Sequence, residues 1–128
     1  MRIAKNDVPV RIAVPGATAR QKTEFGDAPG FGTISGEYFS FGAGTDITPL
    51  LQGLEGDLCQ CPHWGYVVRG ALTTTDRGGI EESVSEGDLF YWPPGHTVKA
   101  DVESDIVMFS PQREHSAVID HIRHKLSG

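Results

Sequence analysis

The chain has 128 residues, 38% of them hydrophobic and 22% charged, which is ordinary for a globular protein with a single core. Its 16 glycines and 8 prolines favour many turns and short strands over long helices, so we expect an all-β fold. The formal net charge of −6 disfavours nucleic acids and anionic membranes as partners, because an acidic surface repels both.

The sequence indicates neither a targeting signal nor a disulfide framework. Residues 1–10 lack the apolar middle region of a secretion signal, and no stretch approaches the roughly 18 apolar residues of a membrane span. The two cysteines, Cys59 and Cys61, are one residue apart and would close almost no loop as a disulfide. We therefore expect a cytoplasmic protein whose cysteines bind a metal or remain free thiols.

Residues 1–32 predict an N-terminal arm with one short edge strand, because seven prolines and glycines interrupt them and no period is sustained. Residues 1–25 hold five basic residues against two acidic ones, whereas the rest of the chain is acidic. Such an arm could pair with its own barrel or with a neighbouring subunit.

Residues 33–110 predict a β-barrel of about eight short strands separated by glycine and proline turns. One of these strands, 57–68, is long and is expected to bend near Pro62 and Gly65. The expected strands are 33–41, 47–51, 57–68, 71–75, 80–84, 89–92, 97–102 and 106–109.

Residues 111–128 predict a C-terminal helix of about three turns, with Ser110 as its N-cap and Pro111 in the first turn. An apolar stripe would face the barrel, made of Val118, Ile119, Ile122 and Leu126. The three histidines of this helix are expected on its solvated face and are not site candidates; they are His115, His121 and His124.

Four polar residues carry the strongest chemical signal. Side chains alternate along a strand, so Cys59, Cys61 and His63 would share one face. If the strand that carries His96 lies opposite, the two thiols and two imidazoles could enclose a metal ion, and these are the donors that zinc prefers. Without a metal, the cysteines would be small buried apolar groups.

Other polar and aromatic side chains could line a pocket beside this site. Asp57 would point to the same side of the strand as the cysteines, but its place after a glycine also suits a solvated turn carboxylate. Tyr66, Tyr91 and Trp92 lie beside turns, where aromatic residues either fill the ends of a small barrel or face a ligand.

The segment 87–96 resembles the second motif of the cupin superfamily. It has a glycine, an apolar strand and a Pro-x-Gly-His turn, and Gly87, Pro93 and Gly95 have the same spacing as the Gly, Pro and Gly of that motif. The first cupin motif is similar to residues 57–70. Aligned on Gly70, it places Asp57 and Cys59 at its two histidine positions and His63 at its glutamate position.

This resemblance covers about residues 45–110 and implies a small jelly-roll barrel. It implies ligand roles for Cys59 and His63, whereas the second-motif histidine position holds Val98, two residues after His96. The three-histidine, one-glutamate set of cupin oxygenases is absent, which disfavours iron-dependent dioxygen chemistry. The run from Cys59 to Gly70 resembles a group of single-domain bacterial cupins, and cupins commonly form homodimers.

Three functions follow from these residues. With three protein ligands, a divalent metal, best fitted by zinc, could act as a Lewis acid or activate water in isomerisation, hydrolysis or decarboxylation of a small polar molecule. With four, the site would be structural or a sensor. Without a metal, the barrel would be a small-molecule binding module with two reduced thiols. No catalytic residue is assigned.

Overall fold

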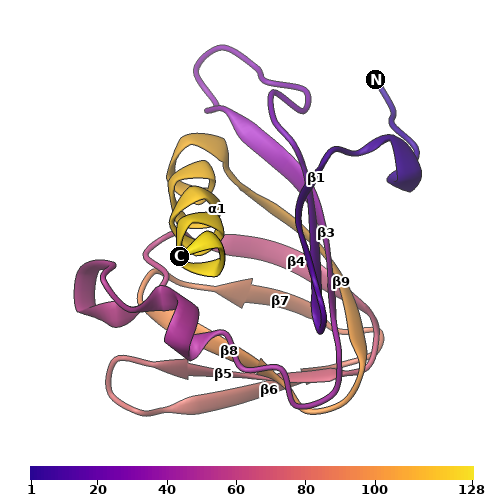
Figure 1. Ribbon diagram of the computed structural model, residues 1–128. Coiled ribbons are helices and arrows are strands. Elements are labelled where there is room, and N and C mark those ends of the chain that lie inside the picture. The colour runs from indigo at the N-terminus through magenta and orange to yellow at the C-terminus, as the bar shows by residue number, and fades with distance from the viewer.

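Nine strands in two antiparallel sheets and one C-terminal helix make up the fold in the computed structural model, which describes residues 1–128 (Figure 1). The strands are β1 (Val10–Val14), β2 (Ala17–Lys22), β3 (Ile34–Phe41), β4 (His63–Arg69), β5 (Ala71–Asp76), β6 (Glu81–Ser85), β7 (Leu89–Trp92), β8 (His96–Ala100) and β9 (Ser104–Pro111). The helices are α1 (Gln112–Ser127) and three 3-10 turns, η1 (Lys5–Asp7), η2 (Thr48–Leu51) and η3 (Glu55–Asp57).

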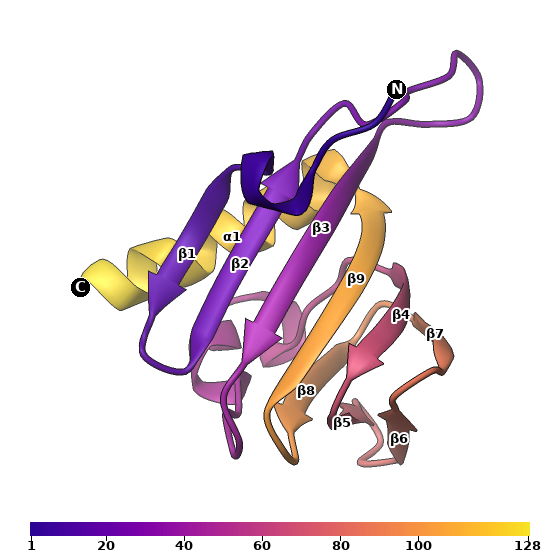
Figure 2. The ribbon, with the colours of Figure 1, turned by 90° about the vertical axis from the view of Figure 1, so that its right-hand side faces the viewer.

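The two sheets face each other across one apolar core. The larger sheet has the order β1-β2-β3-β9-β4-β7, visible edge to edge in Figure 2, and the smaller has the order β6-β5-β8. Alternate residues of the strands point inward, as Ile106 and Met108 do in β9. This arrangement confirms the predicted all-β jelly-roll barrel with a short C-terminal helix. None of the helices is long and apolar enough to cross a membrane.

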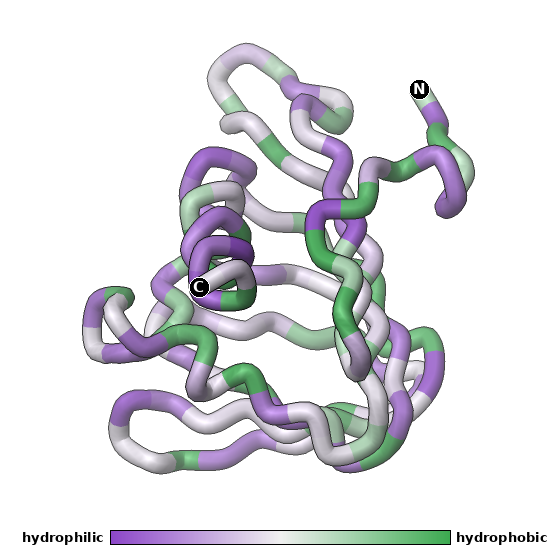
Figure 3. Tube along the Cα trace, viewed as in Figure 1, coloured by the Kyte–Doolittle hydropathy of each residue, from purple (hydrophilic) through white to green (hydrophobic).

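A second apolar cluster lies where α1 and η2 close one end of the barrel. Its members come from β1, β2, η2, the segment before β4 and the helix: Ile12, Ala19, Leu51, Cys59, Cys61, Val118, Ile119 and Ile122. Hydrophobic and hydrophilic residues interchange along α1 (Figure 3), so the helix can bury one side and expose the other.

The N-terminal residues contribute more to the sheet than the sequence predicts. An arm with one short edge strand was expected over residues 1–32, but β1 and β2 pair with each other, and β2 pairs with β3 over six residues. The turn between β1 and β2 uses Gly16 with φ of 87°. The larger sheet thus gains two strands from this segment.

Of the long or bent strand predicted over 57–68, only the second half forms a strand, and the first half is wrong. Gly56 and Asp57 both have positive φ, of 65° and 57°, and this interrupts the extended backbone. The chain then bends, and β4 begins only at His63. Between the two, Cys59 makes an isolated bridge to His96 of β8.

Four details expected of the helix are also wrong: its N-cap, its length, the exposure of His115 and the burial of Leu126. Ser110 is not its N-cap but a buried residue of β9, and α1 spans 16 residues rather than three turns. His115 is buried, at 3% exposed, because it lies on the same helical stripe as Val118, Ile119 and Ile122. Leu126, expected on that stripe, is 40% exposed.

The turn between β4 and β5 requires glycine at position 70. Gly70 has φ of 95°, and a Cβ there would lie 2.3 Å from Ser104 Oγ and 2.4 Å from the Glu103 carbonyl oxygen. Gly70→Ala should lower the free energy of unfolding by about 2–4 kcal/mol, the sum of left-handed strain and overpacking. Urea denaturation of the variant and wild type measures this difference.

Gly79 provides the matched control, because it has φ of 81° but a Cβ at this position would have no other atom within 4 Å. Gly79→Ala should lose only the strain, about 1 kcal/mol. Equal losses at the two positions would contradict a packing role for Gly70.

Candidate metal site

Three side chains that could hold a metal ion converge inside the barrel. Cys59 Sγ and one ring nitrogen each of His63 and His96 all lie within 4.8 Å of one another, and all three residues are buried. The backbone sets this arrangement: Cys59 N donates to His96 O at 2.8 Å, and His96 N donates to Cys59 O at 3.2 Å. His63, at the start of β4, is held opposite Trp92 of β7.

The hydrogen bonds of both imidazoles leave Nε2 without a proton in the neutral rings. His96 Nδ1 lies 2.7 Å from the Pro93 carbonyl oxygen, which can only accept, so Nδ1 carries the proton. His63 Nδ1 lies 2.7 Å from Ser110 Oγ, whose own proton is donated to a carboxylate, so His63 Nδ1 is again the donor. His63 Nε2 is then 3.6 Å from Cys59 Sγ.

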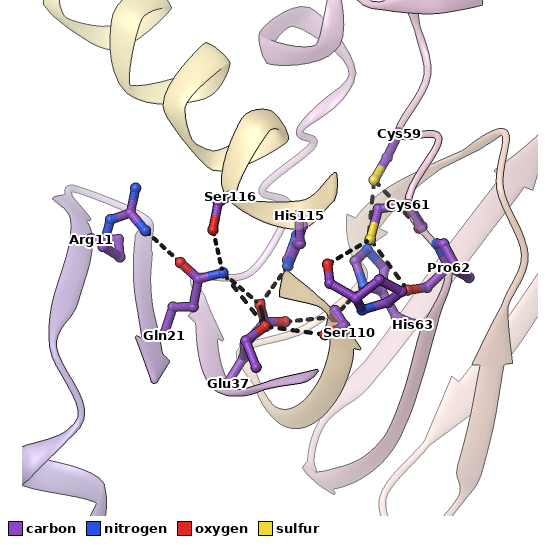
Figure 4. A network of polar contacts seen from close by, with 12 residues as sticks. Arg11, Gln21, Glu37, Cys59, Cys61, Pro62, His63, Ser110, His115 and Ser116 are labelled. Atoms are coloured by element: carbon purple, nitrogen blue, oxygen red, sulfur yellow. Dashed lines mark hydrogen bonds and ion pairs between the residues drawn. The ribbon is translucent and has the colours of Figure 1, made fainter. Parts of the chain in front are cut away.

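That carboxylate belongs to Glu37 of β3, which is 1% exposed and whose side chain reaches toward α1 (Figure 4). It accepts hydrogen bonds from four residues: Ser35 at 2.8 Å, Ser110 at 2.8 Å, His115 at 2.6 Å and Gln21 at 3.3 Å. Gln21 in turn accepts from Arg11, which pairs with Asp120 at 2.6 Å. The network therefore runs from the protein surface to His63 and ends at Cys59.

His115 brings a further imidazole to this network. Its Nδ1 donates to Glu37, and its ring centroid lies 4.3 Å from that of His63. One ligand atom from each of Glu37, His63 and His115 also lies within 4.8 Å of the others. The sequence does hold a signal for His115, because it lies three, four and seven residues before the apolar positions 118, 119 and 122.

Glu37 and Ser110 were not predicted as site residues from the sequence either. Strand alternation places Glu37 between Ser35 and Phe39 on the inward face of β3, and a charged residue at an inward position indicates a buried network. Ser110 looks like a helix cap in the sequence, since it precedes a proline and a helical pattern.

A small cavity lies next to Cys59, His63 and His96. Its volume is about 30 Å³, and eleven of its fourteen lining residues are hydrophobic. Val118 and Ile122 of α1 and Leu51 of η2 close it on the helix side. Trp92 also lines it, and the buried Trp92 Nε1 donor has no hydrogen-bond partner. The cavity thus offers room for a water-sized group, and one of its lining residues holds an unused donor.

Burial governs the protonation of the cluster. It lowers the pKa of His63 well below the ordinary value, and the nearby His115 and His96 lower it further. Burial also lowers the pKa of His96, although the hydrogen bond to Pro93 acts in the opposite direction. The pKa of the Cys59 thiol is raised by burial to about 11, and that of Cys61 is raised as well. Neutral imidazoles and protonated thiols therefore prevail at neutral pH.

The structure separates Cys61 from the other three predicted ligands. Cys61 is buried, but its Sγ contacts the carbonyl oxygens of Pro62 at 3.4 Å and Pro111 at 3.8 Å, and it packs in the apolar cluster beneath α1. The expected sharing of one face fails because the segment 57–62 is bent rather than extended. Cys61 is not part of the group within 4.8 Å.

The predicted pocket residues are divided between the two faces of the larger sheet. Trp92 faces the cavity, whereas Tyr66 and Tyr91 are exposed on the outer face, because they occupy the alternate positions of β4 and β7. Asp57 is exposed and accepts a hydrogen bond from Gly53 N at 2.9 Å. It acts as a turn carboxylate.

Comparison with known proteins identifies the fold. No protein-family model matches the chain, and no curated protein matches it. Solved structures do: an oxalate decarboxylase aligns with 85% of this chain at a TM-score of 0.60 and 22% identity. This chain covers only 28% of that protein's length.

Two smaller structures align over nearly their whole lengths. An RmlC-like cupin from Shewanella frigidimarina aligns with 88% of this chain and 92% of its own at a TM-score of 0.57 and 16% identity. KdgF from a Halomonas species aligns with 88% of this chain and 94% of its own at a TM-score of 0.54 and 20% identity. The chain therefore has the cupin fold, as its two motif-like segments predict.

The buried histidines predict how stability depends on pH in the metal-free protein. Their pKa is lower in the folded state than the ordinary 6.5, so below that pH only the unfolded state binds the protons. The free energy of unfolding should be insensitive to these groups above pH 6.5. From about one pH unit below 6.5, the free energy of unfolding should fall by up to about 2.7 kcal/mol per pH unit, the limit for two protons. Denaturant titrations in chelator across this range measure the slope.

Two single variants show which histidine causes this pH dependence of the free energy of unfolding. His96→Gln should reduce it by up to about 1.4 kcal/mol per pH unit, the limit for one proton. His124→Gln, at an exposed helix position, should leave it unchanged. An unchanged slope in His96→Gln would show that His96 is not held neutral by the fold.

Proposed function

We propose that this protein binds one divalent metal ion, zinc, inside the barrel through Cys59, His63 and His96. The convergence of one thiol and two imidazoles within 4.8 Å carries this proposal. The orientation of the rings supports it, because both Nδ1 atoms donate to protein acceptors and both Nε2 lone pairs remain available. One thiolate and two neutral imidazoles form a donor set that suits zinc.

Three protein ligands leave a fourth position on a tetrahedral ion. A bound zinc ion would supply Lewis acidity or an activated water at that position. The cavity lies beside the ligands, and Trp92 Nε1 could donate a hydrogen bond to an oxygen atom held there. These features favour metal-assisted chemistry on a small polar molecule.

Glu37 and Ser110 would position the ligand His63. Ser110 accepts from His63 Nδ1 and donates to Glu37, so the carboxylate fixes the ring orientation through one hydroxyl group. Outer hydrogen bonds of this kind strengthen a metal site because they set the tautomer and raise the basicity of the ligand. His115, on the other side of Glu37, ties the same carboxylate to α1.

A second function, non-catalytic binding or sensing, has one observation in its favour. The cavity holds only about 30 Å³, and α1 and η2 cover it. Substrate turnover would require this end of the barrel to open, whereas a metal sensor would not. Exchange of the fourth ligand distinguishes the two: added azide changes the spectrum of an open metal site and leaves a closed one unaltered.

Metal analysis and cobalt substitution test the proposal. The purified protein should contain about one equivalent of zinc per chain, and the cobalt form should show tetrahedral bands with sulfur-to-cobalt charge transfer. Cys59→Ser should abolish the charge transfer, because it removes the proposed sulfur ligand. Cys61→Ser is the matched control and should retain it, since Cys61 lies outside the cluster.

Two results would contradict the proposal. One is less than about a tenth of an equivalent of any transition metal in protein that keeps its structure in chelator. The other is loss of charge transfer in Cys61→Ser with retention in Cys59→Ser.

The positioning role has its own test. Ser110→Ala should weaken zinc binding about 10–100-fold while the cobalt spectrum keeps its tetrahedral form, because the ligands remain but His63 loses its acceptor. Competition with a chelator of known affinity measures the change. Ser110→Thr keeps the hydroxyl group and should restore most of the affinity.

Ser116→Ala is the control for this variant. Ser116 Oγ contacts Gln21 Nε2 at 3.3 Å, at the other side of the network, and has no contact with His63. An equal loss of affinity in Ser116→Ala would show that Ser110 has no specific effect on His63.

A further inference from the structure

The helix α1 closes one end of the barrel beside the cavity. Its residues His115, Val118 and Ile122 line the cavity together with side chains from both sheets and from η2. Figure 1 shows α1 against this end, between β1 and the η2 segment. The backbone before η2 is tied to β8, because Ile47 N donates to Val98 O at 3.2 Å, and the strands are held by their ladders. The helix is therefore the element at this end that can move with the least disruption.

One end of α1 is anchored. The helix follows β9 without a linker, and Gln112 N donates to Thr33 O at 3.0 Å. His115, in the first turn, donates to the buried Glu37 carboxylate at 2.6 Å. A buried charge that loses its donors is costly, so this contact resists separation. The first turn is thus the fixed point of the helix.

The other end of α1 is loosely packed. A groove of about 490 Å³ lies between its last turn, residues 123–127, and residues 11–14 of β1. Leu126, in this turn, is 40% exposed. The last turn therefore has room to move relative to β1.

Between the two ends, few contacts hold α1 against the barrel. Beyond the first turn the helix buries three side chains: Val118, Ile119 and Ile122. Asp120 accepts a hydrogen bond from Arg11 of β1 at 2.6 Å. His121 Nε2 donates to Gln52 O at 2.8 Å, next to η2. Both of these polar contacts are exposed, so water can take the place of either partner when they separate.

We propose that α1 is a lid that tilts about its first turn as one unit and opens the cavity to solvent. Segments with few buried apolar contacts and exposed hydrogen bonds open locally, without unfolding of the rest of the protein. When the lid is open, a metal ion or a small polar molecule reaches Cys59, His63 and His96. This consequence rests on the proposed function, whereas the motion does not. When the lid is closed, the helix excludes bulk water from the same side chains.

Thiol labelling of Cys59 in the metal-free protein tests the lid. Cys59 is 3% exposed, so an aromatic disulfide reagent in solution reaches its sulfur only when the cavity opens. In Cys61→Ser, Cys59 is the only thiol, and the labelling rate reports the open fraction when opening and closing are fast. If Cys61→Ser does not fold, tandem mass spectrometry of the labelled wild type identifies which of the two thiols has reacted.

Removing the two exposed contacts should loosen the lid. The double variant Asp120→Ala, His121→Ala should raise the labelling rate about tenfold, because only the closed state loses these contacts. Lys125→Ala, at an exposed position of the same helix, is the matched control and should leave the rate unchanged. An unchanged rate in the double variant would overturn the proposal and place the opening at another element.

Gly79→Ala distinguishes the lid from complete unfolding. Gly79 lies between β5 and β6 of the smaller sheet, so its substitution destabilises the whole fold without touching α1. The labelling rate of Cys59 should stay unchanged in this variant. A rise of about fivefold, the effect of the expected destabilisation on the unfolded fraction, would show that Cys59 is reached only by complete unfolding and would overturn the lid. None of these measurements uses a metal ion, so a failure to bind zinc would contradict the proposed function and leave the lid standing.

Discussion

A carboxylate buried between a sheet and a helix must have its hydrogen-bonding capacity filled, and Glu37 sets this constraint for the whole end of the barrel. An unpaired charge in the interior costs several kcal/mol, so donors have to reach it. They come from β2, β3, β9 and α1. The helix is therefore fixed against the sheet by a polar contact as well as by its apolar stripe, and its position closes the cavity.

The same constraint shapes the candidate metal site. Ser110 has one proton, and giving it to Glu37 obliges its oxygen to accept from His63. This fixes which nitrogen of His63 faces Cys59. At His96 the carbonyl oxygen of Pro93 accepts the Nδ1 proton instead of a hydroxyl group. In both imidazoles the Nε2 lone pair therefore stays free. Burial also keeps the thiol of Cys59 protonated, because it raises the pKa of this group. A metal ion that binds Cys59 would therefore have to displace a proton.

Strand alternation and turn residues were enough to predict the barrel, because glycine and proline separate short apolar runs between 33 and 110. The structure brings Cys59, His63 and His96 together in another way than strand alternation, because the segment 57–62 is bent and an isolated bridge joins Cys59 to His96. The sequence could not exclude Cys61, because the bend at 57–62 arises from two residues with positive φ, and one of them is an aspartate. Glu37, Ser110 and His115 form one network across β3, β9 and α1, and each has an ordinary local explanation in the sequence: strand, cap and solvated helix face.

β4 contributes both to the candidate site and to the outer face of the larger sheet. His63 and Val67 point inward, and Trp64, Tyr66 and Val68 point outward, so a shift of pairing by one residue would exchange the site with the surface. Gly65 opposes such a shift. A Cβ at this position would lie 2.3 Å from Phe90 Cζ and 2.4 Å from the Val107 carbonyl oxygen, so only glycine fits between β7 and β9. Any neighbour moved into its place would bring a side chain into that contact. The register that places His63 beside the other candidate ligands is therefore also the one that exposes Trp64 and Tyr66 on the outer face.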